Sequence, residues 1–285
     1  MTVFEIKQNI IESLASKYQR NEIDGFIRII FEHLKGWSPI DIIMHRDYEL
    51  SDFIIDRINC ILARLQNNEP IQYIVGEGRF FGNTFKVTPA TLIPRQETEE
   101  LVELIVKENS ESDLKVLDIG TGTGCIAIIL SRYLKFPIVD AIDISAQAIE
   151  VAKENAANLK TKINFQVADI FSLQSSRNRY DIIVSNPPYI TEKEKDEMEC
   201  NVVDYEPHSA LFVANDNPIC FYCRIADYAI ESLRKGGKLY FEINPLFADD
   251  ICIMLKEKGF SNVSTQEDIH HRKRFVKAEK PTRCS

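Results

Sequence analysis

The sequence lacks both a long apolar run and an excess of positive charge. Among its 285 residues, no apolar stretch approaches the roughly 20 residues that a membrane-spanning helix needs. The first residues, 1–7, also lack the basic start and apolar core of a signal peptide. With 34 Lys and Arg against 43 Asp and Glu, the formal net charge is −9. These features predict a cytoplasmic protein and disfavour nucleic-acid binding through broad phosphate neutralisation, so the expected macromolecular partner is a protein.

The pattern of cysteines does not indicate a disulfide framework. The seven cysteines are odd in number and scattered, which fits free thiols in a reducing compartment better than a set of disulfides. Cys220 and Cys223 have the spacing of a redox or metal pair, but they lie in an apolar helical pattern and no second pair completes a zinc site. We therefore expect no metal.

The chain is long enough for two domains with separate cores. Residues 1–68 have a helical pattern, in which apolar residues such as Ile6, Ile10 and Leu14 are spaced for one face of a helix. This segment contains no cluster of potential ligands or nucleophiles, which indicates a small helical domain that recognises a partner rather than transforming it.

The next segment, residues 69–92, is predicted to be a β-hairpin connector. Gly82 and Asn83 lie between two aromatic, β-prone runs, which is a hairpin signal of moderate strength. After the connector, Thr98 is expected to cap a helix over residues 99–107, whose acidic first turn suits the helix dipole.

Residues 93–285 are predicted to form an α/β domain. From Lys115 onward, short apolar runs alternate with helical patterns, and a final pair of strands is expected near Val263 and Phe275. Such alternation is typical of a parallel sheet with helices on both faces. The five alternating strands and the final pair give seven, in a Rossmann-like arrangement.

The segment Asn186-Pro187-Pro188-Tyr189 follows one of these strands, residues 180–185. The two prolines stop the strand because they have no N–H to donate, and their carbonyls, together with the oxygen of Asn186, form a surface rich in acceptors. A planar NH₂ group could give one hydrogen to Asn186 and one to a proline carbonyl, while Tyr189 offers a flat face. Alone, the segment could equally be a rigid turn.

A glycine-rich loop, residues 120–124, lies where a strand turns into a helix. Its glycines allow a ligand to approach the backbone, and Asp143 at the end of the next strand can accept both hydroxyls of a ribose. Cys125 replaces the third glycine of the dinucleotide fingerprint, and Asp118 would repel a pyrophosphate. These features favour a cationic nucleoside ligand such as S-adenosylmethionine over NAD, although Asp118 could instead be a structural acid bonded to backbone N–H groups.

The second domain resembles the class I S-adenosylmethionine-dependent methyltransferases that act on a planar nitrogen. Their Asn-Pro-Pro-Tyr motif serves both adenine amino groups and glutamine amides. The whole chain closely resembles the HemK/PrmC family, the peptide chain release factor glutamine methyltransferases. The segments that carry this likeness, beyond the motifs above and the helical domain, are Pro70-Ile-Gln-Tyr-Ile74, Thr88-Pro-Ala90, Leu92-Ile-Pro-Arg95 and Glu97-Thr98-Glu99.

The resemblance implies methylation at N5 of the glutamine in a release factor's Gly-Gly-Gln loop, with S-adenosylhomocysteine as the product. It implies a monomer whose helical domain grips the release factor. The catalytic residues would be Asn186, Pro187 and Tyr189, with Pro188 also binding substrate. The cofactor residues would be Asp118, Gly120, Thr121, Gly122, Thr123, Gly124, Asp143, Asp169 and Ile170, with Thr98 and Asn186 near the methionine end.

Three alternatives remain open at this stage. An adenine-N6 nucleic acid methyltransferase would need a basic groove, and the one obvious basic run, residues 270–274, is more typical of a solvated surface. Methylation of a glutamine on a ribosomal protein would use the same site. A non-catalytic protein that signals cofactor occupancy is disfavoured by the intact Asn-Pro-Pro-Tyr segment.

Overall fold

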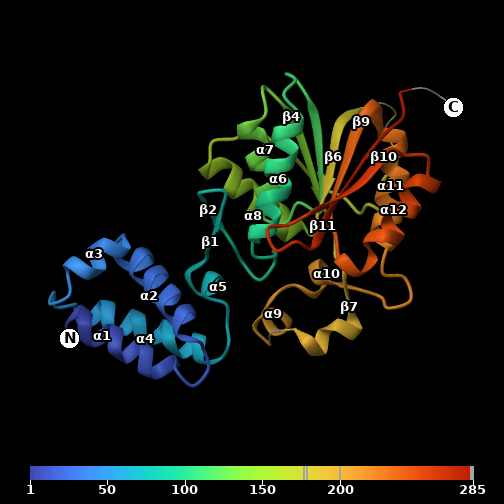
Figure 1. The fold of residues 1–285 in the computed structure, drawn as a ribbon. Helices are drawn as coiled ribbons and strands as arrows, with labels where there is room; N and C mark the ends of the chain where they lie inside the picture. Colours follow the sequence, from blue (N-terminus) through green and yellow to red (C-terminus); the bar gives the residue numbers. More distant parts are fainter. Residues whose placement is uncertain (176, 178, 199, 283–285) are drawn as a thin grey trace. The chain divides into compact units, whose positions relative to one another are not determined.

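The computed structural model describes residues 1–175, 177, 179–198 and 200–282, which form two compact units (Figure 1). The first unit comprises Met1–Glu77 with Glu199–Tyr205, and the second comprises Gly78–Met198 with Glu206–Ser285. The division therefore falls within the predicted connector, and a later segment also belongs to the first unit.

The first unit is a helical bundle, as predicted. In α1, Ile6, Ile10 and Leu14 are buried because they recur on one helix face. Thr2 and Glu5 form a capping box, in which the side chain of each residue accepts the backbone N–H of the other at the start of this helix. The helices of the unit are α1 (Val3–Leu14), α2 (Arg20–Lys35), α3 (Pro39–Met44), α4 (Asp52–Gln66), α5 (Ile71–Val75) and α9 (Cys200–Tyr205).

The predicted hairpin is present as β1 (Glu77–Phe80) and β2 (Asn83–Lys86). Gly82 adopts a φ of 70° in its turn, a value that glycine accepts without steric cost. The hairpin occupies only part of the predicted connector, because the residues just before it form α5, a single turn that ends at Gly76 with a φ of 77°.

In the described part of the second unit, seven strands form one sheet in the order β10-β11-β9-β6-β3-β4-β5. The strands β5, β4, β3, β6 and β9 pair in parallel, whereas β11 is antiparallel to both β9 and β10. This confirms the predicted parallel sheet with its final strand pair. The bounds are β3 (Lys115–Ile119), β4 (Ile138–Asp143), β5 (Asn164–Val167), β6 (Tyr180–Ser185), β9 (Leu233–Glu242), β10 (Ser261–Glu267) and β11 (Lys273–Glu279).

Helices cover both faces of this sheet (Figure 1). One face carries α6 (Gln96–Glu108), α7 (Cys125–Tyr133) and α8 (Ala146–Asn158), and the other carries α11 (Cys220–Ser232) and α12 (Ala248–Glu257). Strand β6 contributes to both cores because its side chains alternate. Ile182 and Val184 pack with the α6 and α7 residues, and Ile183 packs with those of α11 and α12.

Several short elements complete the unit between β6 and α12. The strands β7 (Ile190–Thr191) and β8 (Phe212–Val213) pair in parallel, and α10 (His208–Leu211) precedes β8. Two short 3₁₀ helices span Glu192–Glu197 and Pro245–Phe247. None of the helices in the described residues combines the length and the apolar character needed to cross a bilayer.

The predicted cap of α6 is wrong. The helix begins at Gln96 with Arg95 as its N-cap residue, so Thr98 lies inside the first turn rather than before it. The Thr98 hydroxyl donates a hydrogen bond to the buried carboxyl of Glu242, at 2.7 Å. A capping hydroxyl would instead accept from the backbone N–H groups of the first turn.

Candidate active site

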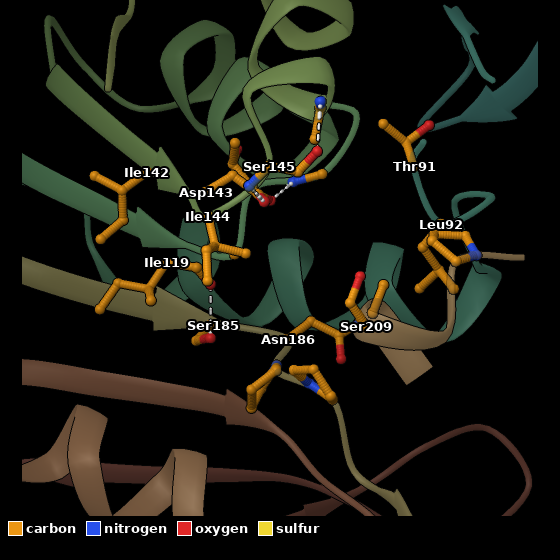
Figure 2. A pocket seen from close by; sticks show the side chains of 18 of the residues that line it. Thr91, Leu92, Ile119, Ile142, Asp143, Ile144, Ser145, Ser185, Asn186 and Ser209 are labelled. Carbon is orange, nitrogen blue, oxygen red and sulfur yellow. Dashed lines mark hydrogen bonds between the residues drawn. The ribbon is translucent and has the colours of Figure 1, made fainter. Parts of the chain in front are cut away.

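A cavity of about 410 Å³ opens at the carboxyl ends of β3, β4 and β6. In the sheet, β3 lies between β4 and β6, so the strand order reverses beside β3. Parallel α/β sheets bind ligands at such a switch point, outside the carboxyl ends of the strands. Figure 2 shows Ile119 and Ile142 on one side of the cavity, with Thr91 and Leu92 on the opposite side.

The glycine loop forms one wall. The N–H groups of Gly120 and Thr121 donate to the carbonyl of Ile142, at 2.9 and 3.0 Å, which holds the loop against β4. Gly120 and Gly122 both have positive φ, and a Cβ at either would have nothing within 4 Å. Their open side therefore leaves the backbone accessible to a ligand, as the sequence predicted.

Gly124 has a different role in the fold. A Cβ there would lie 3.1 Å from the Cβ of Ala152 and 3.2 Å from Cδ1 of Ile128, so glycine allows α7 to pack closely on α8. Gly124 does not line the cavity, whereas Thr121 and Thr123 do. The structure therefore shows a packing role for Gly124, and its contact with a cofactor stays a prediction.

Asp143 lines the cavity at the end of β4 (Figure 2). Its Oδ2 accepts the Gly122 N–H at 2.9 Å, and its Oδ1 accepts the Ser145 N–H at 2.9 Å. Burial raises the pKa of Asp143, while these two N–H groups favour the charged form. Each carboxylate oxygen retains a further lone pair, so the side chain can accept from two neighbouring hydroxyls of a ribose.

Asp118 lies behind the glycine loop rather than in the cavity wall. It is 0% exposed, and its Oδ2 accepts the hydroxyl of Thr121 at 2.6 Å. Burial raises the pKa of Asp118 to about 7. Among the described lining residues Asp118 is absent, so its geometry favours support of the loop over direct contact with a cationic ligand.

This pKa predicts a pH-dependent stability. Between the ordinary pKa of 3.8 and the folded value of about 7, the native state holds a proton that the unfolded chain releases. Relative to Asp118→Asn, the free energy of unfolding should fall as pH rises through this range, by up to about 1.4 kcal/mol per unit, and level off at higher pH. Urea titrations of both cofactor-free proteins at several pH values measure this. A constant difference between them would contradict it.

Asp169 and Ile170 also line the cavity. From the sequence they are expected near the adenine of a cofactor, and that role stays a prediction. Asp169 accepts the Phe171 N–H at 2.9 Å, which fixes the turn after the strand. The ring of Phe171 meets that of Phe221 edge to face, with the centroids 5.2 Å apart, and both residues belong to the lining. The result is an apolar end suited to a planar ring.

Three of the four residues in the Asn-Pro-Pro-Tyr segment line the cavity. Asn186, Pro187 and Pro188 line the cavity, and Ser185 before them donates to the carbonyl of Ile119 at 2.7 Å. The Nδ2 of Asn186 lies 3.4 Å from Oγ1 of Thr98, which also lines the cavity.

Tyr189 is placed differently from the flat stacking face that the sequence predicted. It is not among the described lining residues, and its hydroxyl donates to Oε1 of Glu242 at 3.2 Å. The Asn244 side chain donates to the Tyr189 carbonyl at 3.2 Å, which fixes the backbone of the segment. Tyr189 therefore supports the segment from behind the wall.

The far wall of the cavity, which contains Thr91 and Leu92, was not predicted from the sequence. Glu206 holds this wall together, because it pairs with Arg95 at 2.5 Å and accepts the Ile93 N–H at 3.3 Å. The apolar pair Leu92 and Ile93 before Pro94 was a signal for part of it, but the contribution near Glu206 has no motif. The lining residues in question are Ala90, Thr91, Leu92, Ile93, Pro94, Arg95, Pro207, Ser209, Ala210 and Phe212.

The residues present fit S-adenosylmethionine. The cavity volume lies within the range of about 300 to 1,000 Å³ that is usual for small-molecule sites. It offers a carboxylate for a ribose at Asp143, open backbone at Gly120 and Gly122, and an apolar end near Ile170. When bound, this group would supply an electrophilic methyl on a sulfonium.

The sheet order, the glycine loop and the strand-end carboxylate define a class I, S-adenosylmethionine-dependent methyltransferase. A methyltransferase structure from Pyrococcus furiosus has the same fold, with a TM-score of 0.52 and 17% identity over 77% of this chain and 97% of that one. A 16S rRNA methyltransferase from T. thermophilus also has a TM-score of 0.52, with 19% identity over 72% and 49% of the two chains.

Sequence comparisons identify the family. Residues 96–204 match the Methyltransferase small domain and residues 5–76 match the PrmC N-terminal domain. A release factor glutamine methyltransferase of Bacteroides thetaiotaomicron is 45% identical, covering 95% of this chain and 98% of its own length. One from Flavobacterium psychrophilum is 40% identical, covering 97% and 99%. The chain belongs to the release factor glutamine methyltransferase family.

Proposed function

We propose that this protein transfers the methyl group of S-adenosylmethionine to N5 of the glutamine in the Gly-Gly-Gln motif of peptide chain release factors. The observation that carries the proposal is the position of Asn186 and Pro187 in the wall of the cavity that also contains Asp143. A carboxamide oxygen and a donor-free backbone there match the two hydrogens of an amide NH₂. The full-length likeness to enzymes of that name supports the choice of glutamine.

The chain's own residues would act by orientation. An amide nitrogen is a weak nucleophile because its lone pair is delocalised into the carbonyl. If Oδ1 of Asn186 and the Pro187 carbonyl each accept one N–H, the remaining lobe of the nitrogen faces the methyl donor. Positioning of this kind contributes about 7 to 11 kcal/mol in favourable cases.

The cavity also supports transfer by excluding water. Its lining is mostly apolar, and transfer removes the charge of the sulfonium, so a dry site favours the reaction. No strong base is required before the methyl moves, because orientation exposes the lone pair while both protons are still held by acceptors. Once the methyl is bonded, the substrate nitrogen is cationic and strongly acidic, so it gives up one of its two protons to solvent water. We therefore assign no proton-abstracting histidine.

The helical segment, residues 1–68, is proposed to bind the release factor away from the reacting glutamine, with residues 69–92 as connector and 93–285 as the methyltransferase domain. The protein would act as a cytoplasmic monomer without direct nucleic acid contact. The net charge of −9 is consistent with a protein substrate.

Mass spectrometry tests the proposal directly. Full-length release factors incubated with this protein and S-adenosylmethionine should gain one methyl on the Gly-Gly-Gln glutamine, and release factors carrying alanine at that glutamine should gain none. Ribosomal proteins and adenine-containing oligonucleotides are incubated in parallel. Methylation of one of those, with none on the release factors, would overturn the assignment.

A further inference from the structure

Glu242 is a buried acid that no motif identifies, and it lies directly behind the Asn-Pro-Pro-Tyr segment. It ends β9, between Phe241 and Ile243, and is 1% exposed. Its Oε2 accepts the Thr98 hydroxyl at 2.7 Å, and its Oε1 accepts the Tyr189 hydroxyl at 3.2 Å. Among the described residues it does not line the cavity, so any influence on a substrate must pass through these neighbours.

The two oxygens of Glu242 are both acceptors in the hydrogen bonds around it. Burial raises the pKa of this carboxyl and the charge of Glu97 acts in the same direction, while the hydroxyls of Thr98 and Tyr189 and the positive charge of Arg274 oppose the shift. Arg274 lies on the adjacent strand β11, where Phe275 pairs with Glu242. Thr98 and Tyr189 each direct a hydroxyl proton at a different oxygen of this carboxyl, so Glu242 is the acceptor in both hydrogen bonds.

The direction then propagates to Asn186. A threonine hydroxyl has a single proton, and in Thr98 this proton is directed to Glu242. Thr98 can therefore offer only a lone pair to Asn186, whose Nδ2 lies 3.4 Å away. Because the NH₂ of Asn186 faces Thr98, its Oδ1 must point away from Thr98.

We infer that Glu242, acting through the hydroxyl of Thr98, is a positioning residue that fixes the orientation of the Asn186 amide, so that the cavity presents a hydrogen-bond acceptor and selects an amide NH₂ over a carboxylate. The amide identity of the substrate rests on the proposed function. If the Asn186 side chain could flip, it would present an NH₂ donor, which suits glutamate and repels glutamine.

Two variants test this inference. Thr98→Val removes the hydroxyl with little change in shape, and Glu242→Gln introduces a donor into the chain of hydrogen bonds. Calorimetry measures the affinity of each protein, loaded with S-adenosylhomocysteine, for a full-length release factor with glutamine or with glutamate in its Gly-Gly-Gln motif. The wild type should prefer glutamine, and each variant should lose about tenfold of that preference. In both variants, kcat should fall about 10- to 100-fold, and the affinity for S-adenosylhomocysteine should fall by a smaller factor.

Thr98→Ser is the matched control, because it keeps the hydroxyl and should recover most of what Thr98→Val loses. A loss of kcat with an unchanged preference for glutamine would show a merely structural role and overturn the inference. So would wild-type preference and kcat in both variants.

Orientation can also be read without a release factor. A nuclear Overhauser contact between the Asn186 side-chain amide protons and the Thr98 methyl group is expected in the wild type and should weaken in Glu242→Gln. Its absence from the wild type would overturn the inference. Its presence in a protein that methylates no release factor would count against the proposed function instead.

Discussion

Replacing Asn186 with alanine is expected to lower kcat for methyl transfer at least about a thousandfold, because the substrate nitrogen loses an acceptor that orients its lone pair. The affinity for S-adenosylmethionine should change far less, since Asp143 and the glycine loop remain. Stopped-time assays with a release factor give kcat, and calorimetry gives the cofactor affinity.

The control for this variant is Asn158→Ala. Asn158 is the last residue of α8 and is exposed outside the cavity, so this change should leave the rate at the wild-type level. Thermal unfolding of Asn186→Ala shows whether the fold is retained. Turnover near the wild-type rate in a folded Asn186→Ala protein would refute the role of Asn186.

Replacing Asp143 with alanine is expected to weaken cofactor binding by about 3 kcal/mol, or roughly a hundredfold in Kd, if two ribose hydroxyls donate to this carboxylate. The change also removes the acceptors for the N–H groups of Gly122 and Ser145, which loosens the loop that lines the cavity. Isothermal calorimetry with S-adenosylmethionine and with S-adenosylhomocysteine measures the loss.

Asp143→Asn and Glu150→Ala are the companion variants. The asparagine keeps one oxygen and should give an intermediate affinity. Glu150 is an exposed acid on α8, so its loss should leave the affinity unchanged. If Asp143→Ala bound cofactor as the wild type does, the ribose assignment would have to be abandoned.

The sheet could be predicted because its signals are local. Strands β3, β4 and β6 are short apolar runs, and each is followed by a polar or glycine-rich turn that the parallel arrangement brings to one edge. Gly120, Asp143 and Asn186 were therefore predicted separately, from their own strand ends, and the structure brings them around one cavity.

The rest depends on contacts between distant residues. Thr98 has the sequence signature of a helix cap, and only Glu242, 144 positions away, draws its hydroxyl to the interior. The one available signal was an acid between Phe241 and Ile243, near the end of an apolar run over residues 239–243. The pairing of Glu206 with Arg95 could not be predicted, because no motif marks Glu206 and the pair joins segments 111 positions apart.

The order of the sheet has a consequence for synthesis of the chain. Strand β11 is translated after the other six strands of the described sheet, yet it occupies an internal place between β9 and β10. Glu242 pairs with Phe275 of β11, so this strand pairing can form only after residue 275 has been synthesised. The carboxyl ends of β3, β4 and β6 can therefore come together during translation, whereas the strand that lies beside Glu242 is added last.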